Sequence, residues 1–281
     1  MAIKILIDSA SDMSVAEAKE LGVEFMPMEI KFGEEEFLDG ISLYPEEFYK
    51  RLKNSKVLPK TSQINPFRWE EKLDELTKDG SEVIVICLSS KISGTYESLN
   101  SIYEKYEGKV HIFDSLTVAI GERLLCYYAL DLIKQGLNAK EVVSALQQVV
   151  PKLHVMAVVD TLEYLKKGGR ISSTVALAGT LLSIKPVVAI VDGEVKMLGK
   201  AMGLKKANRL MSDIVKQNNG INLDMPFGTI WAGDDENLQK YVSDNACLWE
   251  GREMKSYIIG CTIGTHVGPG CAGIAFFEKD L

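Results

Sequence analysis

The sequence lacks an excess of basic residues. Its 281 residues include 32 lysines and arginines against 39 aspartates and glutamates, so the formal net charge at pH 7 is −7. Non-specific binding to nucleic acid requires a basic surface, and recruitment by anionic lipid headgroups requires clustered lysine and arginine. We therefore expect no nucleic-acid partner and at most a transient contact with a membrane.

Paired cysteines and long apolar runs are also missing. The five cysteines are odd in number and lack ligand-like spacing, which argues against disulfides or a zinc site and favours a reducing cytoplasm. A spanning helix needs about 18 or more apolar residues, whereas Lys185 and Pro186 interrupt the most apolar stretch, Val175–Val191. The chain starts with the pattern of a strand instead of a signal peptide. We expect a cytoplasmic protein without a transmembrane segment or a bound metal.

Strands and helices alternate through the first half of the sequence. Capping pairs at Ser14 with Glu17, and at Asn138 with Glu141, mark two helix starts. The alternation predicts a parallel sheet with helices on both faces. Strands rich in apolar residues, as is typical of strands buried on both faces, are predicted at Ile3–Ile7, Val83–Leu88, Val110–Phe113 and Val155–Val159.

The rhythm changes after about residue 160. Asp192-Gly193 separates two extended segments and predicts a β-hairpin, because both residues tolerate the positive φ of a tight turn. Later strand and helix patterns predict an α+β arrangement, so we expect two domains, 1–160 and 161–281. The later elements are expected at Leu204–Gln217, Gly228–Trp231, Glu236–Trp249, Lys255–Ile259 and Ala272–Phe277.

Hydroxyl side chains follow the predicted strands of the first half. In an open parallel sheet the ligand crevice lies beyond the carboxyl ends of the strands. Ser93-Gly94-Thr95, at the start of a predicted helix, offers free backbone N–H groups to an anion. Few basic residues accompany it, which favours a single carboxylate over a phosphate. Taken singly, residues such as Ser9 could equally cap helices or make turns.

His266 differs from the other two histidines, which fall at predicted strand starts. It lies within Gly264–Gly270, and the flanking glycines predict a backbone turn that presents the imidazole. A Ser–His pair for acyl transfer is one alternative, although a Gly-x-Ser-x-Gly elbow is missing. Neither a phosphate-binding P-loop nor a His-Glu-x-x-His motif occurs, and the glycine pairs do not form a dinucleotide fingerprint. We expect no cofactor.

Six motifs in order resemble the DegV family, whose better-studied members are the fatty-acid-binding subunits of bacterial fatty acid kinase. The resemblance spans nearly the whole chain. The matching stretches are Asp8-Ser-Ala-Ser-Asp12, Pro59-Lys-Thr-Ser-Gln63, Ser89-Ser-Lys-Ile-Ser-Gly-Thr-Tyr96, Leu162-Glu-Tyr-Leu-Lys-Lys-Gly-Gly-Arg-Ile-Ser172, Lys185-Pro186 and Thr265-His-Val-Gly-Pro-Gly270.

The resemblance implies a Rossmann-like first domain, a second α/β domain and an acyl tunnel between them. Thr61, Ser93 and His266 would hold the carboxylate of a long-chain fatty acid. A partner kinase subunit would convert the bound fatty acid to an acyl phosphate for phospholipid synthesis, so the chain itself would be a carrier and not an enzyme. We expect the supporting residues of this pocket to be Ser9, Ser62, Gly94 and Thr95.

Two details bear on this interpretation. Val175–Val191 is the candidate tunnel wall, since its small residues Ala176, Ala178 and Gly179 leave room for a chain. Met202 stands where many relatives have an arginine, which puts any kinase-docking role of that position in doubt. From the residues themselves, a Ser/His acyl hydrolase and a non-lipid small-molecule-binding protein stay open beside the fatty-acid carrier.

Overall fold

Four parallel strands form the first sheet of the computed structural model, which describes residues 2–171 and 183–279. Ile5, Leu6 and Ile7 are almost fully buried, as a continuous apolar run requires in a sheet covered on both faces. The predicted parallel sheet is therefore confirmed. Its strands are, in spatial order, β2 (Glu24–Met26), β1 (Ile3–Asp8), β6 (Glu82–Cys87) and β7 (Val110–Asp114).

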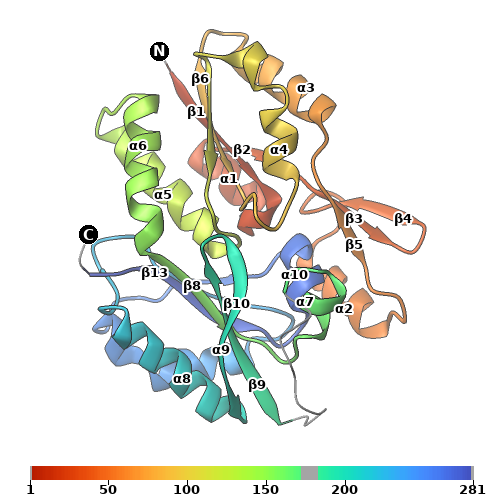
Figure 1. Ribbon diagram of the computed structural model, residues 1–281, viewed down its shortest axis with the longest axis vertical. Coiled ribbons are helices and arrows are strands. Elements are labelled where there is room, and N and C mark those ends of the chain that lie inside the picture. Colours follow the sequence, from red (N-terminus) through yellow and green to blue (C-terminus); the bar gives the residue numbers. More distant parts are fainter. Residues whose placement is uncertain (1, 172–182, 280–281) are drawn as a thin grey trace.

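Helices cover both faces of this sheet. α5 (Ile120–Lys134) and α6 (Ala139–Val149) lie on one side, and α3 (Pro66–Thr77) and α4 (Thr95–Asn100) lie on the other (Figure 1). The predicted capping box opens α6, with Asn138 and Glu141 each bonding the other's backbone N–H. Ser14 likewise caps α1 (Val15–Leu21).

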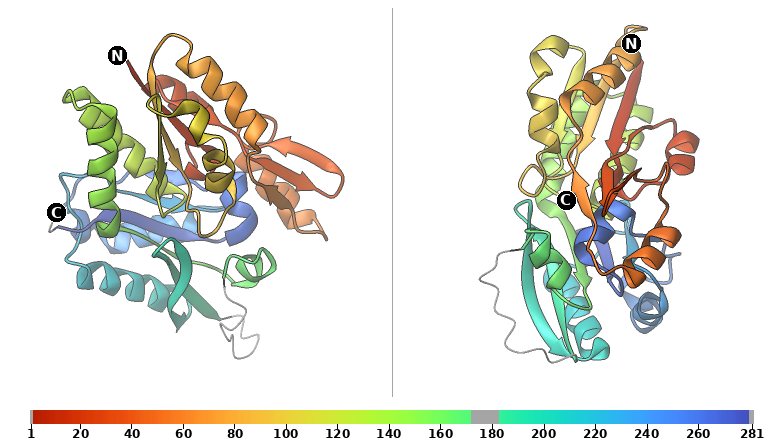
Figure 2. Two further views of the ribbon diagram at one scale, coloured as in Figure 1. Left: turned by 45° about the horizontal axis from the view of Figure 1, so that its top comes forward. Right: turned by 90° about the vertical axis from the view of Figure 1, so that its right-hand side faces the viewer.

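A second, mixed sheet contains six strands. Asp192 and Gly193 both have positive φ and join β9 to β10, so the predicted hairpin is confirmed. α8 (Leu204–Gln217) and α9 (Glu236–Asp244) cover the outer face of this sheet (Figure 2). The strand order is β10 (Glu194–Met202), β9 (Ile184–Val191), β8 (Leu153–Val158), β13 (Ala272–Phe277), β11 (Gly228–Trp231) and β12 (Ser256–Ile258).

The prediction that Val155–Val159 continues the parallel sheet is wrong. β8 runs antiparallel between β9 and β13 in the second sheet. A buried apolar run has the same pattern in either sheet, so periodicity does not identify the neighbouring strands. The division at residue 160 stays a prediction, because strand pairing does not establish which segments fold independently.

α5 lies between the two sheets. It contacts β1 and β6 on one side and β8, β11 and β13 on the other. One continuous apolar core accordingly joins Ile7 of the first sheet, Leu124 of α5 and Phe277 of the second sheet. Among the described residues, no helix is long and apolar enough to cross a membrane.

A small third sheet projects beside the junction of the two larger sheets (Figure 1). It consists of β4 (Glu35–Leu38), β3 (Glu29–Phe32) and β5 (Lys60–Ser62). Glu35 and Glu36 begin β4, with exposed side chains. The short helices nearby are α2 (Pro45–Asn54), α7 (Glu163–Lys167) and α10 (Cys261–Val267).

Candidate functional site

Five polar side chains from separate segments line one cavity at the junction of the sheets. Three of them are the residues predicted to hold a carboxylate, and the other two were not predicted. We call this the polar cavity, lined by Thr61, Ser93, Arg170, Thr262 and His266 among apolar neighbours. Thr61 comes from β5, Ser93 precedes α4, Arg170 follows α7, and the last two lie on α10.

Thr61 and His266 are in direct contact. The Thr61 Oγ1 atom lies 3.0 Å from Nε2 of His266, within hydrogen-bond distance. Ser93 has different partners, because its hydroxyl donates to Thr95 Oγ1 at 3.0 Å and accepts from the Thr95 backbone N–H at 3.2 Å. Ser93 therefore faces the same cavity without bonding to the imidazole, which weighs against a Ser–His acyl-transfer pair.

His266 lies in a helix, so the prediction of a backbone turn is wrong. Gly264, interpreted as a turn residue, is inside α10, where an added Cβ would lie 2.7 Å from the Tyr49 hydroxyl of α2. The glycine thus permits close packing of two helices instead of a reversal of the chain. The helical spacing places Thr262 and His266 four residues apart, on one face directed to the cavity.

Two buried aspartates fix the start of α10. The Asp39 carboxylate accepts from the backbone N–H groups of Cys261 at 3.2 Å and Thr262 at 3.0 Å. Asp12 accepts from the backbone N–H of Gly260 at 2.9 Å. Burial raises the pKa of Asp39, although these hydrogen bonds oppose the rise. The first sheet and the small sheet thereby position the helix that carries His266.

Arg170 brings the positive charge of the cavity. Its Nε donates to the carbonyl of Ile92 at 3.2 Å and its Nη1 donates to the carbonyl of Gly168 at 2.5 Å. Within residues 2–171 and 183–279, it forms no ion pair with a carboxylate. Burial lowers its pKa, but a guanidinium stays protonated in proteins. Among the described residues this half-buried guanidinium is bonded to carbonyl groups, and such a cation is suited to an anion that enters from outside.

His266 is uncharged in this environment. Burial, and then the neighbouring charge of Arg170, lower its pKa to about 4. Its Nδ1 is buried and has no hydrogen-bond partner in the described part of the chain. Gly168 backs directly onto that nitrogen, since an added Cβ there would lie 2.4 Å from Nδ1. Gly168 therefore makes room for the imidazole.

The lowered pKa of His266 predicts a loss of stability in mild acid. In the unfolded chain the imidazole titrates near 6.5, so between pH 6.5 and 4 the unfolded chain binds a proton that the folded protein excludes. Between pH 7 and pH 5 we expect the free energy of unfolding to fall by about 2 kcal/mol from this group. Urea unfolding at both pH values measures the change. The His266→Asn variant should lack this part, and an equal loss in the variant would contradict the assignment.

The four predicted supporting residues lie outside the lining of the polar cavity. Ser9 is behind it, because its hydroxyl accepts from the Met28 backbone N–H at 3.0 Å and lies 3.4 Å from Thr262 Oγ1. Thr95 holds Ser93, as described above. Gly94 packs against the Gln63 side chain. Ser62 is exposed, since it follows Thr61 in a strand and points the opposite way.

An apolar cavity adjoins the polar one. The two share five apolar side chains, and the apolar cavity then extends between α5 and the second sheet, where Val155, Ala157 and Val188 line it. The shared side chains are Val118, Leu165, Val195, Ile263 and Val267. The site is therefore a charged, hydroxyl-lined cavity that adjoins an apolar one.

Two methionines line the cavities and two others do not. Met28 lines the polar cavity and Met156 lines the apolar cavity. Met26 is buried elsewhere, and Met202 is 61% exposed. Of the candidate wall Val175–Val191, the part with Ala176, Ala178 and Gly179 lies outside the described residues, while the rest contributes Val188, Ala189 and Ile190 through β9.

Sequence reasoning missed Arg170 and Thr262. Arg170 stands in the sequence as one of three basic residues of the motif Leu162–Ser172, and nothing local distinguishes it from Lys166 and Lys167. Thr262 would have been found from its spacing to His266 had the segment been predicted as a helix.

In the described residues, no group of three or more histidine, cysteine or acidic side chains could hold a metal ion.

Comparison with known proteins identifies the DegV family over nearly the full length of the chain. The family model described as "Uncharacterised protein, DegV family" matches residues 2–279. A DegV domain-containing protein of Caldanaerobacter subterraneus is 34% identical over 99% of both chains. A structure concerning fatty acid binding by a DegV family protein of Thermus thermophilus is 26% identical with a TM-score of 0.89, covering 99% of this chain and 100% of that one. DegV of Bacillus subtilis, described as a fatty acid binding protein, is 27% identical with a TM-score of 0.86 and the same coverage.

Proposed function

Because the chain belongs to the DegV family, we propose that it binds a long-chain fatty acid. The carboxylate would lie in the polar cavity between Thr61, Ser93 and His266, and the acyl chain would fill the apolar cavity. The observation that carries the proposal is that the two cavities adjoin, because an anion site beside an apolar cavity matches an amphipathic carboxylic acid. The similarity to the fatty-acid-binding DegV proteins of Thermus thermophilus and Bacillus subtilis supports it.

The acyl chain would supply the affinity. Each buried CH₂ contributes about 0.8 kcal/mol, so a dozen methylenes contribute roughly 10 kcal/mol. Loss of translational and rotational freedom costs on the order of 4–15 kcal/mol. The carboxylate loses its hydration as it enters, which is unfavourable unless it is hydrogen-bonded. The polar groups would therefore offset that penalty and orient the ligand, with Arg170 as the counter-charge.

Ser93→Ala tests the carboxylate site. A hydrogen bond to a charged group contributes about 1.5–3 kcal/mol, so we expect fatty acid affinity to fall about tenfold or more. Isothermal titration with palmitate measures the loss. Ser90→Ala is the matched control, because Ser90 lies nearby but does not line the cavity. Equal affinity in the two variants would remove Ser93 from the site.

Lipid extraction of the purified protein tests the ligand class. We expect mass spectrometry to identify co-purified fatty acid, and added fatty acid to raise the melting temperature. The absence of both effects would contradict the proposal. Steady turnover of p-nitrophenyl esters, lost in Ser93→Ala, would favour a hydrolase instead of a carrier.

We further propose that the chain presents its bound carboxylate to a partner kinase in the cytoplasm, and that the resulting acyl phosphate feeds phospholipid synthesis. The resemblance of its motifs to the fatty acid kinase subunits supports this step. Met202 is exposed at the end of the edge strand β10, so a partner docked there would meet a thioether instead of the arginine of many relatives. Hydroxylamine trapping of acyl phosphate, with kinase subunit and ATP added, measures the transfer.

A further inference from the structure

Strands β8 and β9 separate partway along their length. They pair at three positions, Met156 with Ala189, Ala157 with Val188, and Val158 with Val187. Beyond Met156, the residues Leu153–Val155 of β8 pair with β13 alone, and Ile190–Val191 of β9 pair with β10 alone. The second sheet is therefore split between these two strands at the end nearest the first sheet.

The split has a structural cause at the hairpin tip. The Ser89 hydroxyl, which follows β6 of the first sheet, donates to the Gly193 carbonyl at 2.7 Å and is fully buried. An added Cβ on Gly193 would lie 2.7 Å from Ser89 Oγ and 3.1 Å from the side chain of Leu116. The tip is thus packed against the first sheet, as Figure 1 shows, and β9 leans away from β8 to reach it.

The split lies between two spaces. On its inner side is the apolar cavity. On its outer side is a groove that we call the outer groove, lined among others by Leu116, Pro151, Leu198 and Ile214. Four residues, two from each strand, belong to the lining of both spaces. They are Val155, Met156, Ala189 and Ile190. These four side chains therefore stand between the apolar cavity and the outer groove.

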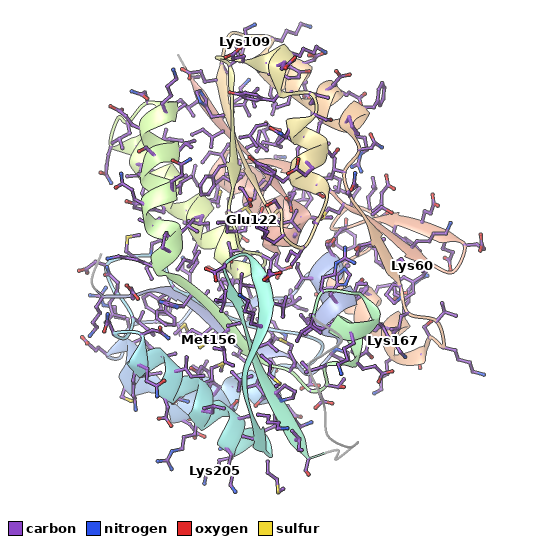
Figure 3. All side chains as sticks on the ribbon, in the orientation of Figure 1. Lys60, Lys109, Glu122, Met156, Lys167 and Lys205 are labelled. Carbon is purple, nitrogen blue, oxygen red and sulfur yellow. The ribbon has the colours of Figure 1, made fainter. Side chains whose placement is uncertain are left out.

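The four side chains alternate across the sheet. Val155 belongs to the core that contains α5, whereas Met156 and Ala189 belong to the core beneath α8. Met156 lies in the lower half of the molecule, on the side toward α8 (Figure 3). Methionine adapts readily to irregular space, and the methyl group of Ala189 leaves the opposite wall small. Leu198, at a bulge of β10 and 41% exposed, adds apolar surface to the outer groove.

We propose that the acyl cavity has a second opening between β8 and β9, through which the methyl end of longer fatty acids enters the outer groove. This inference rests on the proposed function, because it concerns the far end of the same ligand. It assigns Val155, Met156, Ala189 and Ile190 as the residues that determine which chain lengths the protein accepts.

The opening changes how affinity depends on chain length. While added methylenes are buried, each increases affinity about fourfold, since burial contributes about 0.8 kcal/mol per CH₂. A closed cavity would then reject longer chains abruptly, because overpacking is unfavourable. With the second opening, affinity instead stays level for chains that extend into the outer groove.

A plugged variant tests this behaviour. Ala189→Met narrows the opening, while Ala201→Met adds the same side chain to β10 outside both spaces and is the control. Titration with saturated acids from lauric to behenic acid gives, for each protein, the affinity for every acid relative to that for lauric acid. For arachidic and behenic acids, Ala189→Met should lose about tenfold or more relative to both others. An abrupt loss of affinity for arachidic acid in the wild-type protein itself would overturn the proposal.

Photocrosslinking of the wild-type protein does not depend on how the variants fold. Fatty acids that carry a diazirine at the methyl end are bound, irradiated and mapped by peptide mass spectrometry. A myristic analogue should label the apolar cavity, for example Ile230, and an arachidic analogue should label Pro151, Leu198 or Ile214. Labelling of the apolar cavity alone by both analogues would overturn the second opening while leaving fatty acid binding intact. Failure of palmitate to bind at all would instead reject the proposed function, and with it this inference.

Discussion

Arg170→Met is expected to weaken fatty acid binding about thirtyfold or more while the protein stays folded. The variant keeps much of the apolar stem but removes the positive charge beside His266. A carboxylate that enters the polar cavity would then lose its counter-charge, and breaking a buried charge pair costs about 2–5 kcal/mol. The lower end of that range corresponds to about thirtyfold in affinity. Titration with palmitate measures the effect.

Lys60→Met is the matched control for charge. Lys60 neighbours Thr61 on β5, is exposed and does not line the cavity, and Figure 3 shows it on the projecting small sheet. Its loss should change affinity by less than about twofold, because exposed charges are screened. Arg170→Met should also raise the pKa of His266, since the charge of Arg170 is one cause of its lowering. NMR titration of the imidazole checks this. Equal losses in both variants would contradict a specific role for Arg170.

Gly268→Ala is expected to lower the free energy of unfolding by about 2–6 kcal/mol, through two separate costs. Gly268 ends α10 with φ +72° and ψ −179°, a region that is essentially restricted to glycine. An added Cβ would also lie 2.3 Å from the ring of Tyr164, on α7. Either α10 or the ring must move, and both lie beside the polar cavity. Urea unfolding measures the loss.

Gly169→Ala separates the two costs. Gly169 has nearly the same φ, +71°, but an added Cβ would meet nothing within 4 Å. This control should therefore lose about 1 kcal/mol from backbone strain alone. Adding Tyr164→Ala to Gly268→Ala should recover the steric part, giving a favourable coupling energy in a double-mutant cycle. A loss in Gly268→Ala no larger than that in Gly169→Ala would show that the Tyr164 contact is relieved without cost.

Local signals in the sequence were sufficient for several elements. Asp192-Gly193 specifies its turn because both residues must adopt positive φ, and Asn138 with Glu141 satisfy each other's backbone donors. Interactions of this kind involve residues a few positions apart. They can therefore be read from the chain without knowing the rest of the fold.

Features that depend on distant partners could not be read in this way. β8 has the same apolar pattern that a strand of the first sheet would have. Its position between β9 and β13 depends on pairing with distant segments, and β13 lies more than a hundred residues further along the chain. α10 was mistaken for a turn because Gly264 is required by contact with α2, not by local geometry. Arg170 becomes part of the site because the segment after α7 lies beside α10, which carries His266.

The carboxylate-holding set itself came from the motifs of a family. Hydroxyl groups near Ser93 indicated an anion site, but neither Thr61 nor His266 carries a local signal that joins it to Ser93. Their 3.0 Å contact links β5 to α10 across 205 positions of sequence. Physical reasoning from the residues accounts for the kind of ligand charge, while the shape and length of the apolar cavity depend on how the two sheets enclose α5.

The position of α5 has a kinetic consequence. Because this helix contributes to one core with both sheets, a rigid-body hinge between them would expose buried side chains such as Leu124 and Phe277. Fully exposing each such side chain costs about 1.5–3 kcal/mol, so wide opening would be rare. Ligand exchange should therefore proceed through local fluctuations of short segments around the cavities. Residence time would then follow the stability of those segments, as amide hydrogen exchange reports it, and not the global unfolding free energy.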